Sequence, residues 1–156
     1  MTMCPVCYEI YGDLWPLPCD ICHSTTISVS VELVRIVKMF IIRGFKVNYA
    51  NCSTYGDKLR GGKITQIKID FGDLYPEAIF GNLPPDWLIT YYHRVYYQKI
   101  SADKYTGLSC ACLHPEGECD DSCVDYDIFL AISNLESWLG DKDVRACKAV
   151  LLLTGC

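Results

Sequence analysis

Cysteine dominates the chemistry available to this chain, with 11 occurrences among 156 residues. The first four cysteines form two Cys-x2-Cys pairs separated by eleven residues: Cys4, Cys7, Cys19 and Cys22. Each pair can close a turn in which both thiolates point at one ion, and structural zinc prefers four such sulfurs in a tetrahedral arrangement. The spacing therefore predicts a closed metal site at the head of the chain, with iron as the alternative to zinc.

Residues 4–22 resemble the zinc ribbons and rubredoxin-like knuckles of many small proteins, which implies a zinc-ribbon-like head over residues 1–26. Knuckles of this kind often carry glycine after the second cysteine of each pair, whereas Tyr8 and His23 occupy those positions here. Two interpretations follow from this difference. Either the backbone of the knuckle is strained, or His23 replaces one of the sulfur ligands.

A second cluster has the pattern Cys-x-Cys-x-His-x4-Cys-x3-Cys and consists of Cys110, Cys112, His114, Cys119 and Cys123. Glycine and proline residues around the cluster indicate a loop over residues 107–124, which has little to fold around except an ion. We expect a second zinc ion here, bound most simply by the four cysteines, with His114 in reserve. The alternative is a disulfide or a redox-sensitive loop.

The elements that must position these clusters can be predicted from hydrophobic patterning. Between Ser30, which can cap a helix, and Gly44, which can end one, polar residues recur every third position in an apolar run; this predicts a helix over Val31–Arg43. Strands are expected at Thr26–Val29, Phe45–Tyr49, Ile64–Phe71 and Trp87–Ile100, with a polar loop at Ser53–Gly62. Later helices are expected from Ile128 to Gly140 and over Val144–Leu153.

These elements predict an α+β fold, with helices packed on one face of a small sheet, a zinc-ribbon-like head and an inserted cysteine-rich metal loop. The head covers residues 1–26 and the body residues 27–156, and no proline- or serine-rich linker separates them. A hydrophobic content of 51% argues against disorder, and no apolar run approaches the ~20 residues of a membrane-spanning helix. Residues Met1–Ile10 do not have the pattern of a secretory signal. We therefore expect a cytoplasmic protein with no membrane partner.

Several short motifs follow one another along the body. They are Val29–Val37, Gly44–Tyr49, Asn51–Ser53, Leu83–Trp87 and Leu135–Trp138. Their types and order over residues 27–140 resemble a set of small uncharacterised α+β proteins of phages and Firmicutes, although this chain lacks the glycine that ends their Ser-Cys-Ser-Gly-like loop. The resemblance implies a phage or mobile-element origin more than any chemistry.

Motifs of common catalytic sites are absent from the sequence: there is no Gly-x4-Gly-Lys-Ser/Thr loop, no Gly-x-Ser-x-Gly elbow and no His-Glu-x-x-His. Cys52 and His93 could form a Cys–His pair, but we favour a packed apolar role for Cys52 and an ordinary strand position for His93. Cys147 and Cys156 also lie outside both clusters. Because closed four-sulfur zinc sites leave no open coordination position, we expect no enzymatic activity.

Charge is unevenly distributed around a formal net charge of −5. The segment Glu116–Asp127 holds six acidic residues and no basic one, and such a run can dock a basic partner, including a nucleic-acid-binding protein. The middle of the chain is basic, with Arg35, Lys38, Arg43, Lys46, Lys58, Arg60, Lys63 and Lys68, and it also carries Tyr91, Tyr92, Tyr96 and Tyr97.

Two functions agree with this distribution of charge. The first, which we favour, is a zinc-stapled protein–protein interaction module of phage type that inhibits a host nucleic-acid-targeting defence, similar in kind to anti-CRISPR proteins. The alternative is a zinc-containing regulator that binds nucleic acid through the head, the basic middle and its tyrosines.

Overall fold

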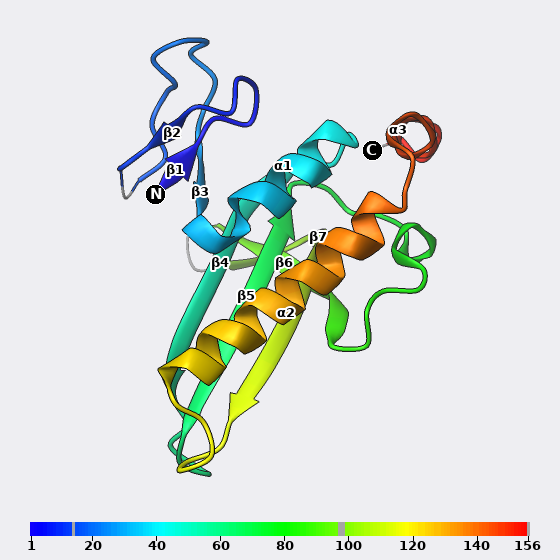
Figure 1. The fold of residues 1–156 in the computed structure, drawn as a ribbon. Helices are drawn as coiled ribbons and strands as arrows, with labels where there is room; N and C mark the ends of the chain where they lie inside the picture. The colour runs from blue at the N-terminus through cyan, green and yellow to red at the C-terminus, as the bar shows by residue number, and fades with distance from the viewer. Residues whose placement is uncertain (14, 97–98, 156) are drawn as a thin grey trace.

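The computed structural model describes residues 1–13, 15–96 and 99–155 (Figure 1). The strands are β1 (Thr2–Met3), β2 (Ile10–Tyr11), β3 (Ile27–Val29), β4 (Val47–Gly56), β5 (Lys63–Phe71), β6 (Trp87–Tyr96) and β7 (Lys99–His114). The helices are η1 (Val31–Leu33), α1 (Val34–Ile42), η2 (Glu77–Phe80), α2 (Asp121–Gly140) and α3 (Val144–Leu153), of which η1 and η2 are short 3-10 helices. Tyr97 and Cys156 lie outside the described residues, as does the side chain of Tyr96.

The seven strands form one mixed sheet in the order β2-β1-β3-β4-β5-β7-β6. Among the described pairs only β3 and β4 run parallel. Helices α1 and α2 lie side by side across one face of the sheet, and α3 follows α2 beside the end of α1 (Figure 1). The α+β fold with helices packed on one face is therefore confirmed.

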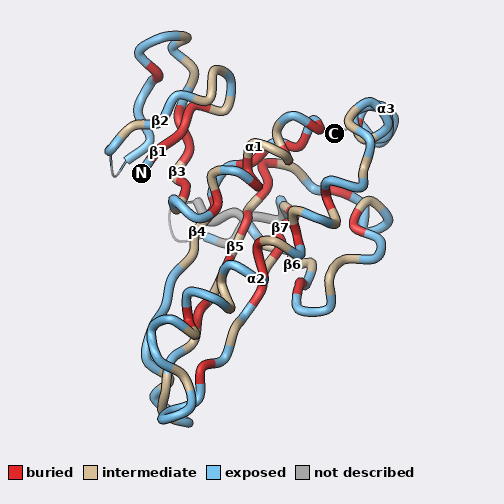
Figure 2. Tube along the Cα trace, viewed as in Figure 1, coloured by how far each residue is buried: buried red, intermediate tan, exposed pale blue. Residues whose placement is uncertain are grey.

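The core lies between α1, α2 and the covered face of the sheet, where the buried residues gather (Figure 2). On the central strand β5, Thr65, Ile67, Ile69 and Phe71 are buried, while the residues between them are half-buried. Since β5 pairs with β4 and β7, its alternation decides which side chains of those strands face the helices. Burial of this face supplies most of the hydrophobic stabilisation of the body.

Helix α1 ends as the glycine signal predicts. The N–H of Gly44 donates to the carbonyl of Ile41 at 2.9 Å, and the N–H of Phe45 donates to that of Phe40 at 3.1 Å. Gly44 has a φ of 95°, so the turn is a Schellman motif, in which a left-handed residue lets the chain satisfy the last carbonyls of a helix.

No helix in the described part of the chain is long and apolar enough to cross a membrane.

The start of this helical segment differs from the prediction. The segment begins with the 3-10 turn η1, and the hydroxyl of Ser30 does not cap it. Instead, Ser30 Oγ accepts a hydrogen bond from the N–H of Cys52 at 2.9 Å. The prediction of Ser30 as a side-chain cap is wrong because a tertiary bond to β4 uses the hydroxyl.

The sheet is more extensive than the sequence pattern indicated. Strand β4 continues to Gly56, through part of the segment Ser53–Gly62 that was expected to be a loop. The segment Trp87–Ile100, expected to be one strand, holds β6 and the start of β7, which pair as an antiparallel hairpin.

The segment 107–124 is also different from the expected cysteine-rich loop. Residues up to His114 belong to β7 and pair with β5 from Asp70↔Gly107 to Lys63↔His114, and α2 already begins at Asp121. The ring of Tyr92 packs closely over the backbone of Gly107, and a Cβ atom at this position would lie 2.6 Å from Tyr92 Cε2. Glycine is therefore needed within the strand at this point. Only a short connection between β7 and α2 remains irregular.

The position of α1 can be tested with two aspartate substitutions. Val37 is fully buried against the sheet, whereas Val31 in η1 is 63% exposed. Val37→Asp would bury a carboxylate without a partner and should lower the free energy of unfolding by about 3–5 kcal/mol. Val31→Asp should change it by less than about 0.5 kcal/mol. Urea unfolding followed by circular dichroism measures both values, and equal midpoints would contradict this placement of α1.

Candidate metal centres

Each of the two Cys-x2-Cys pairs folds into a turn, and the same type of backbone hydrogen bond closes both turns. The N–H of Tyr8 donates to the carbonyl of Cys4 at 3.0 Å, and the N–H of His23 donates to that of Cys19 at 2.9 Å. The residue after each pair has a positive φ, 63° for Tyr8 and 59° for His23. These are the positions where related knuckles carry glycine, so both turns adopt a conformation that costs a residue with a side chain about 1–2 kcal/mol.

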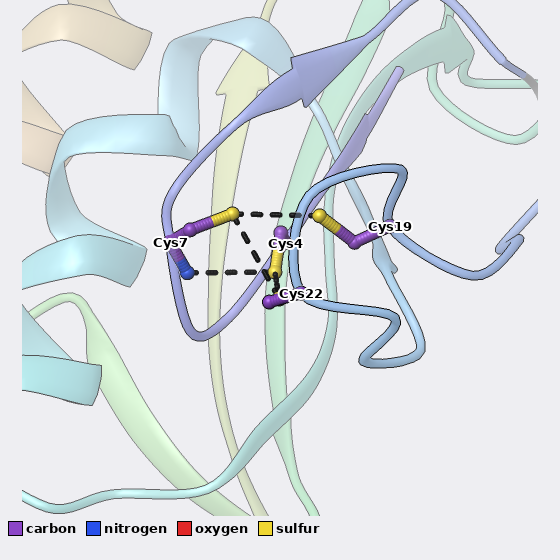
Figure 3. A group of neighbouring side chains, drawn as sticks. All are labelled: Cys4, Cys7, Cys19 and Cys22. Carbon is purple, nitrogen blue, oxygen red and sulfur yellow. Dashed lines mark hydrogen bonds between the residues drawn. The ribbon is translucent and has the colours of Figure 1, made fainter.

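Four sulfurs converge between these two turns (Figure 3). The Sγ–Sγ distances are 3.4 Å for Cys4–Cys22, 3.4 Å for Cys7–Cys19 and 3.9 Å for Cys7–Cys22, and all four atoms lie within 4.8 Å of one another. Zinc with Zn–S bonds of about 2.3 Å holds tetrahedral sulfurs about 3.8 Å apart. The cluster, with two buried and two half-buried cysteines, therefore fits a zinc site.

Of the two interpretations that Tyr8 and His23 left open, the geometry favours a strained knuckle. The side chain of His23 is exposed, and its ring is not among the converging ligand atoms. The N–H groups of Val6 and Cys7 point toward Cys4 Sγ at 3.4 and 3.5 Å, as is expected around a metal-bound thiolate.

Tyr11 on β2 supports the cluster from outside, and it is not among the residues that the sequence predicts for this site. Its hydroxyl donates to Cys19 Sγ at 3.2 Å and accepts the N–H of Asp20 at 3.1 Å. The hydrogen bond from Tyr11, helped by the N–H groups of Cys22 and Ile21, lowers the pKa of the Cys19 thiol to about 6. Tyr11 therefore favours the thiolate, which is the form that binds metal. No spacing rule marks such a residue, because the contact depends on how the second turn folds against β2.

The head is an extension of the sheet rather than a separate appendage. Strand β1 pairs with both β2 and β3, and Met3 is buried in the main core immediately before Cys4. The ammonium of Lys38 on α1 lies 5.8 Å from the centroid of the Tyr8 ring, which adds a cation–π contact to the first turn. The first sulfur ligand is thus positioned by the body.

The second cluster does not assemble as predicted. Cys110 and Cys112 lie on β7 and face the helices; Cys110 belongs to the core, and Cys112 packs against it. The hydrogen bond between the two thiols raises the pKa of Cys110 and lowers that of Cys112, and burial raises both. Among the described residues, neither sulfur joins a group of converging ligand atoms. The expected set of Cys110, Cys112, Cys119 and Cys123 is therefore not brought together.

A different group converges where β7 ends and α2 begins. His114 Nδ1 lies 3.2 Å from Asp127 Oδ2 and 3.8 Å from Cys119 Sγ, and these atoms form the second set within 4.8 Å. The imidazole of His114 is buried, while Cys119 and Asp127 are half-buried. His114 is the predicted reserve ligand, whereas Asp127 is not in the predicted set; it lies on α2, one residue before the start of the predicted helix at Ile128.

The Cys–His pair considered for catalysis is not formed. Cys52 packs against the core, and burial raises the pKa of its thiol to about 11. His93 lies on β6, and strands β5 and β7 lie between β6 and β4, which carries Cys52. The residue of β6 in register with Cys52 is Trp87, and His93 is six residues further along the strand. At about 4.8 Å per strand and about 3.3 Å per residue, the two residues are about 25 Å apart.

The ligands of the head can be tested by metal content. Cys19→Ser should remove about one metal equivalent and loosen residues 1–26, because a structural zinc site contributes to the folding of the segment around it. His23→Ala should keep that equivalent. Elemental analysis of the purified variants measures the difference. Equal metal content in the two variants would contradict the four-cysteine assignment.

The role of Tyr11 can be tested by a substitution that removes only its hydroxyl group. Tyr11→Phe removes the hydroxyl that donates to Cys19 and should weaken metal binding about tenfold, as is typical for the loss of a partner of a metal ligand. Tyr55→Phe, at an exposed position of β4, is the matched control and should have no effect. Competition with a colorimetric chelator gives both affinities. A Tyr11→Phe protein with the affinity of Tyr55→Phe would rule out this role.

Comparison with known proteins identifies no relative: no protein-family model, no curated protein and no solved structure matches the chain. What these centres bind must therefore be inferred from their own ligand atoms, distances and burial.

Proposed function

We propose that this chain is a zinc-stapled protein–protein interaction module that docks a basic partner protein between α1 and α2. The observation that carries the proposal is a groove of about 430 Å³ between the start of the α1 segment and α2. Ile128, Phe129 and Ile132 supply its apolar lining, and Glu32, Asp125 and Glu136 supply its acidic lining. A lining that is both apolar and acidic suits a partner segment that carries apolar and basic side chains.

The exposed side of α2 supports docking at this groove. Phe129 is 65% exposed and Tyr126 is 61% exposed, although large aromatic residues are among the most favourable to bury. Exposed aromatic side chains that lie together are typical of surfaces that bind another protein. Among the described residues that line the groove, Arg35 is the only basic one; it lies 3.6 Å from Glu136, so it neutralises that carboxylate and leaves the others available.

In this proposal zinc acts as a structural staple. The head has few buried apolar residues of its own, and a zinc ion in the four-cysteine cluster would fix it to the edge of the sheet. A closed four-sulfur site leaves no coordination position for chemistry, so the head is assigned no catalytic role.

We further propose that the partner is a basic nucleic-acid-targeting defence protein of the host, and that the chain is its inhibitor, of phage or mobile-element type. The acidic residues from Glu116 to Asp125 lie on the connection to α2 and on its first turns, and all are exposed; Asp121 is paired with Lys63. Exposed acidic residues can occupy a site that otherwise binds phosphates, as in anti-CRISPR-like inhibition.

The alternative, a nucleic-acid-binding regulator, is favoured by one observation. The face of the sheet away from the helices carries Tyr49, Tyr55 and Lys68, and the rings of Tyr92 and Tyr105 stack there at 5.3 Å. Rings on an open sheet can stack against bases. However, the carboxylate of Asp70 lies on the same face of the sheet, and its negative charge weakens the attraction of that face for phosphate.

Several basic residues of the middle of the chain already have partners within the chain: Arg35 with Glu136, Lys46 with Asp73, Lys63 with Asp121, and Arg43 with the carbonyls of Met39 and Lys142. We therefore favour the protein partner. Steep salt-dependent binding to mixed DNA and RNA near physiological salt would reverse this preference.

The docking surface can be tested with a pair of exposed residues. Phe129→Ser removes the aromatic ring from the groove, whereas Leu59→Ser alters a residue that is 95% exposed in the turn between β4 and β5. Against a panel of purified RNA-guided nucleases, the wild-type chain should bind and inhibit at least one. Phe129→Ser should weaken that binding at least tenfold, which corresponds to at least about 1.4 kcal/mol and is typical of a central interface residue.

The control variant and two possible outcomes test the inhibitor proposal and the location of the docking site separately. Leu59→Ser should inhibit as strongly as the wild type, and both variants should melt at the wild-type temperature. If the wild-type chain binds and inhibits no nuclease, the inhibitor proposal is wrong. If a nuclease is bound equally well by Phe129→Ser, the partner is correct but docks away from the groove.

A further inference from the structure

We propose that His114 Nδ1, Cys119 Sγ and Asp127 Oδ2 bind a second zinc ion, with one coordination position open to water or a small anion. The site is distinct from the head, has a different ligand set from the one that cysteine spacing predicts, and does not depend on the docking proposal. Three protein ligands and one exchangeable position are the arrangement of reactive zinc sites, whereas structural sites are closed.

The distances between the three atoms match a single ion. Zinc with bonds of about 2.0 Å to nitrogen and oxygen and about 2.3 Å to sulfur places tetrahedral N and O about 3.3 Å apart, and N and S about 3.5 Å apart. The observed separations are 3.2 Å for His114 Nδ1–Asp127 Oδ2 and 3.8 Å for His114 Nδ1–Cys119 Sγ. The ligand atoms therefore lie close to their bound positions without rearrangement of the backbone.

Two hydroxyl groups in sequence, the first of them buried, hold the histidine in the orientation that metal binding needs. His114 Nε2 lies 2.9 Å from Thr65 Oγ1, and Thr65 Oγ1 lies 2.7 Å from Thr54 Oγ1. Thr65 is fully buried, so the ring nitrogen that does not face the cluster already has a hydrogen-bond partner. With zinc on Nδ1, the proton resides on Nε2 and is donated to Thr65, as is usual for metal-bound histidines.

The open position follows from the arrangement of the neighbouring side chains. Cys123 contacts Cys119 and lies one helical turn before Asp127 on α2, but its sulfur is not among the converging atoms. The side chain of Asp127 is 39% exposed, whereas the imidazole of His114 is 1% exposed. The site is thus closed by the sheet on the histidine side and accessible from solvent on the helix side.

The charges at the site suit an anionic or neutral fourth ligand. One thiolate and one carboxylate make the zinc centre formally neutral, in contrast to a centre with four thiolates, which carries a charge of about −2 and repels anions. Lys63 interacts electrostatically with Cys119 and lies 2.8 Å from Asp121 Oδ1, so a cation stands at the edge of the site. We therefore expect small anions to reach the ion.

The experiment uses Co²⁺ as the probe in the full-length chain. The zinc-loaded protein is treated with a chelator of moderate affinity, which should empty the mixed-ligand site before the four-sulfur site, and is then titrated with Co²⁺. Wild-type protein should take up about one Co²⁺ with a weak thiolate-to-cobalt band, and millimolar azide should shift its visible bands. Asp127→Asn and Cys119→Ser should each lose this uptake while keeping one zinc per chain.

Control variants separate the ligands from their surroundings. Glu118→Gln, one residue before Cys119, and Cys123→Ser should both keep the Co²⁺ uptake and the azide response. Absence of uptake by the wild type, or uptake retained in both Asp127→Asn and Cys119→Ser, would overturn the site. Bound Co²⁺ that ignores azide, or loss of the cobalt–thiolate intensity in Cys123→Ser, would overturn the open position by showing that a fourth protein ligand closes it.

Discussion

The alternation of side chains along β5 is the constraint on which the rest of the structure depends. Ile67, Ile69 and Phe71 are fully buried on one face, and β5 pairs over most of its length with β4 and β7. A slip of one residue in either pairing would turn every side chain of that neighbour to the opposite face. The same register that buries Cys110 under α2 therefore aims His114 at the first turns of that helix.

Both metal-compatible clusters lie where the apolar core ends. On the helix-covered face of β5, the buried residue after the apolar Ile67 is the polar Thr65. There the hydroxyl of Thr65 and the imidazole of His114 form a hydrogen bond with each other instead of packing against apolar side chains. At the other side of the sheet Met3 is the last core residue before Cys4, and the turns beyond β1 contain few buried side chains. Metal–ligand bonds are an efficient way to hold segments that are too short to build a core of their own.

What could be predicted from the sequence is what depends on a few neighbouring residues. A Cys-x2-Cys turn brings two sulfurs together whatever surrounds it, so the head cluster was predictable, as was the end of α1 at Gly44. The role of Ser30 was not, because the N–H of Cys52 comes from another strand.

The second cluster failed as a prediction because its ligands are set by sheet register and by where α2 begins. Leu108, Cys110, Cys112 and His114 face the helices and alternate with Ser109, Ala111 and Leu113. Counting cysteine as a small apolar residue reveals the two-residue period of a strand, whereas counting it as a ligand suggests a loop. Asp127 could be recognised as a neighbour of His114 only once α2 was known to start at Asp121.

The second metal site and the docking groove use neighbouring residues of the same turns of α2, so binding of the ion and binding of the partner can be coupled. Asp127 would bind the second ion, while Asp125 and Phe129, two residues to either side, line the groove. An ion and a partner that both order this segment must strengthen each other's binding by the same factor. The segment is already held by Asp120, whose carboxylate accepts the N–H of Cys123 at 3.0 Å, a cap worth about 1 kcal/mol. Little ordering free energy is then left to share, so the ion would adjust the affinity for the partner rather than switch it on.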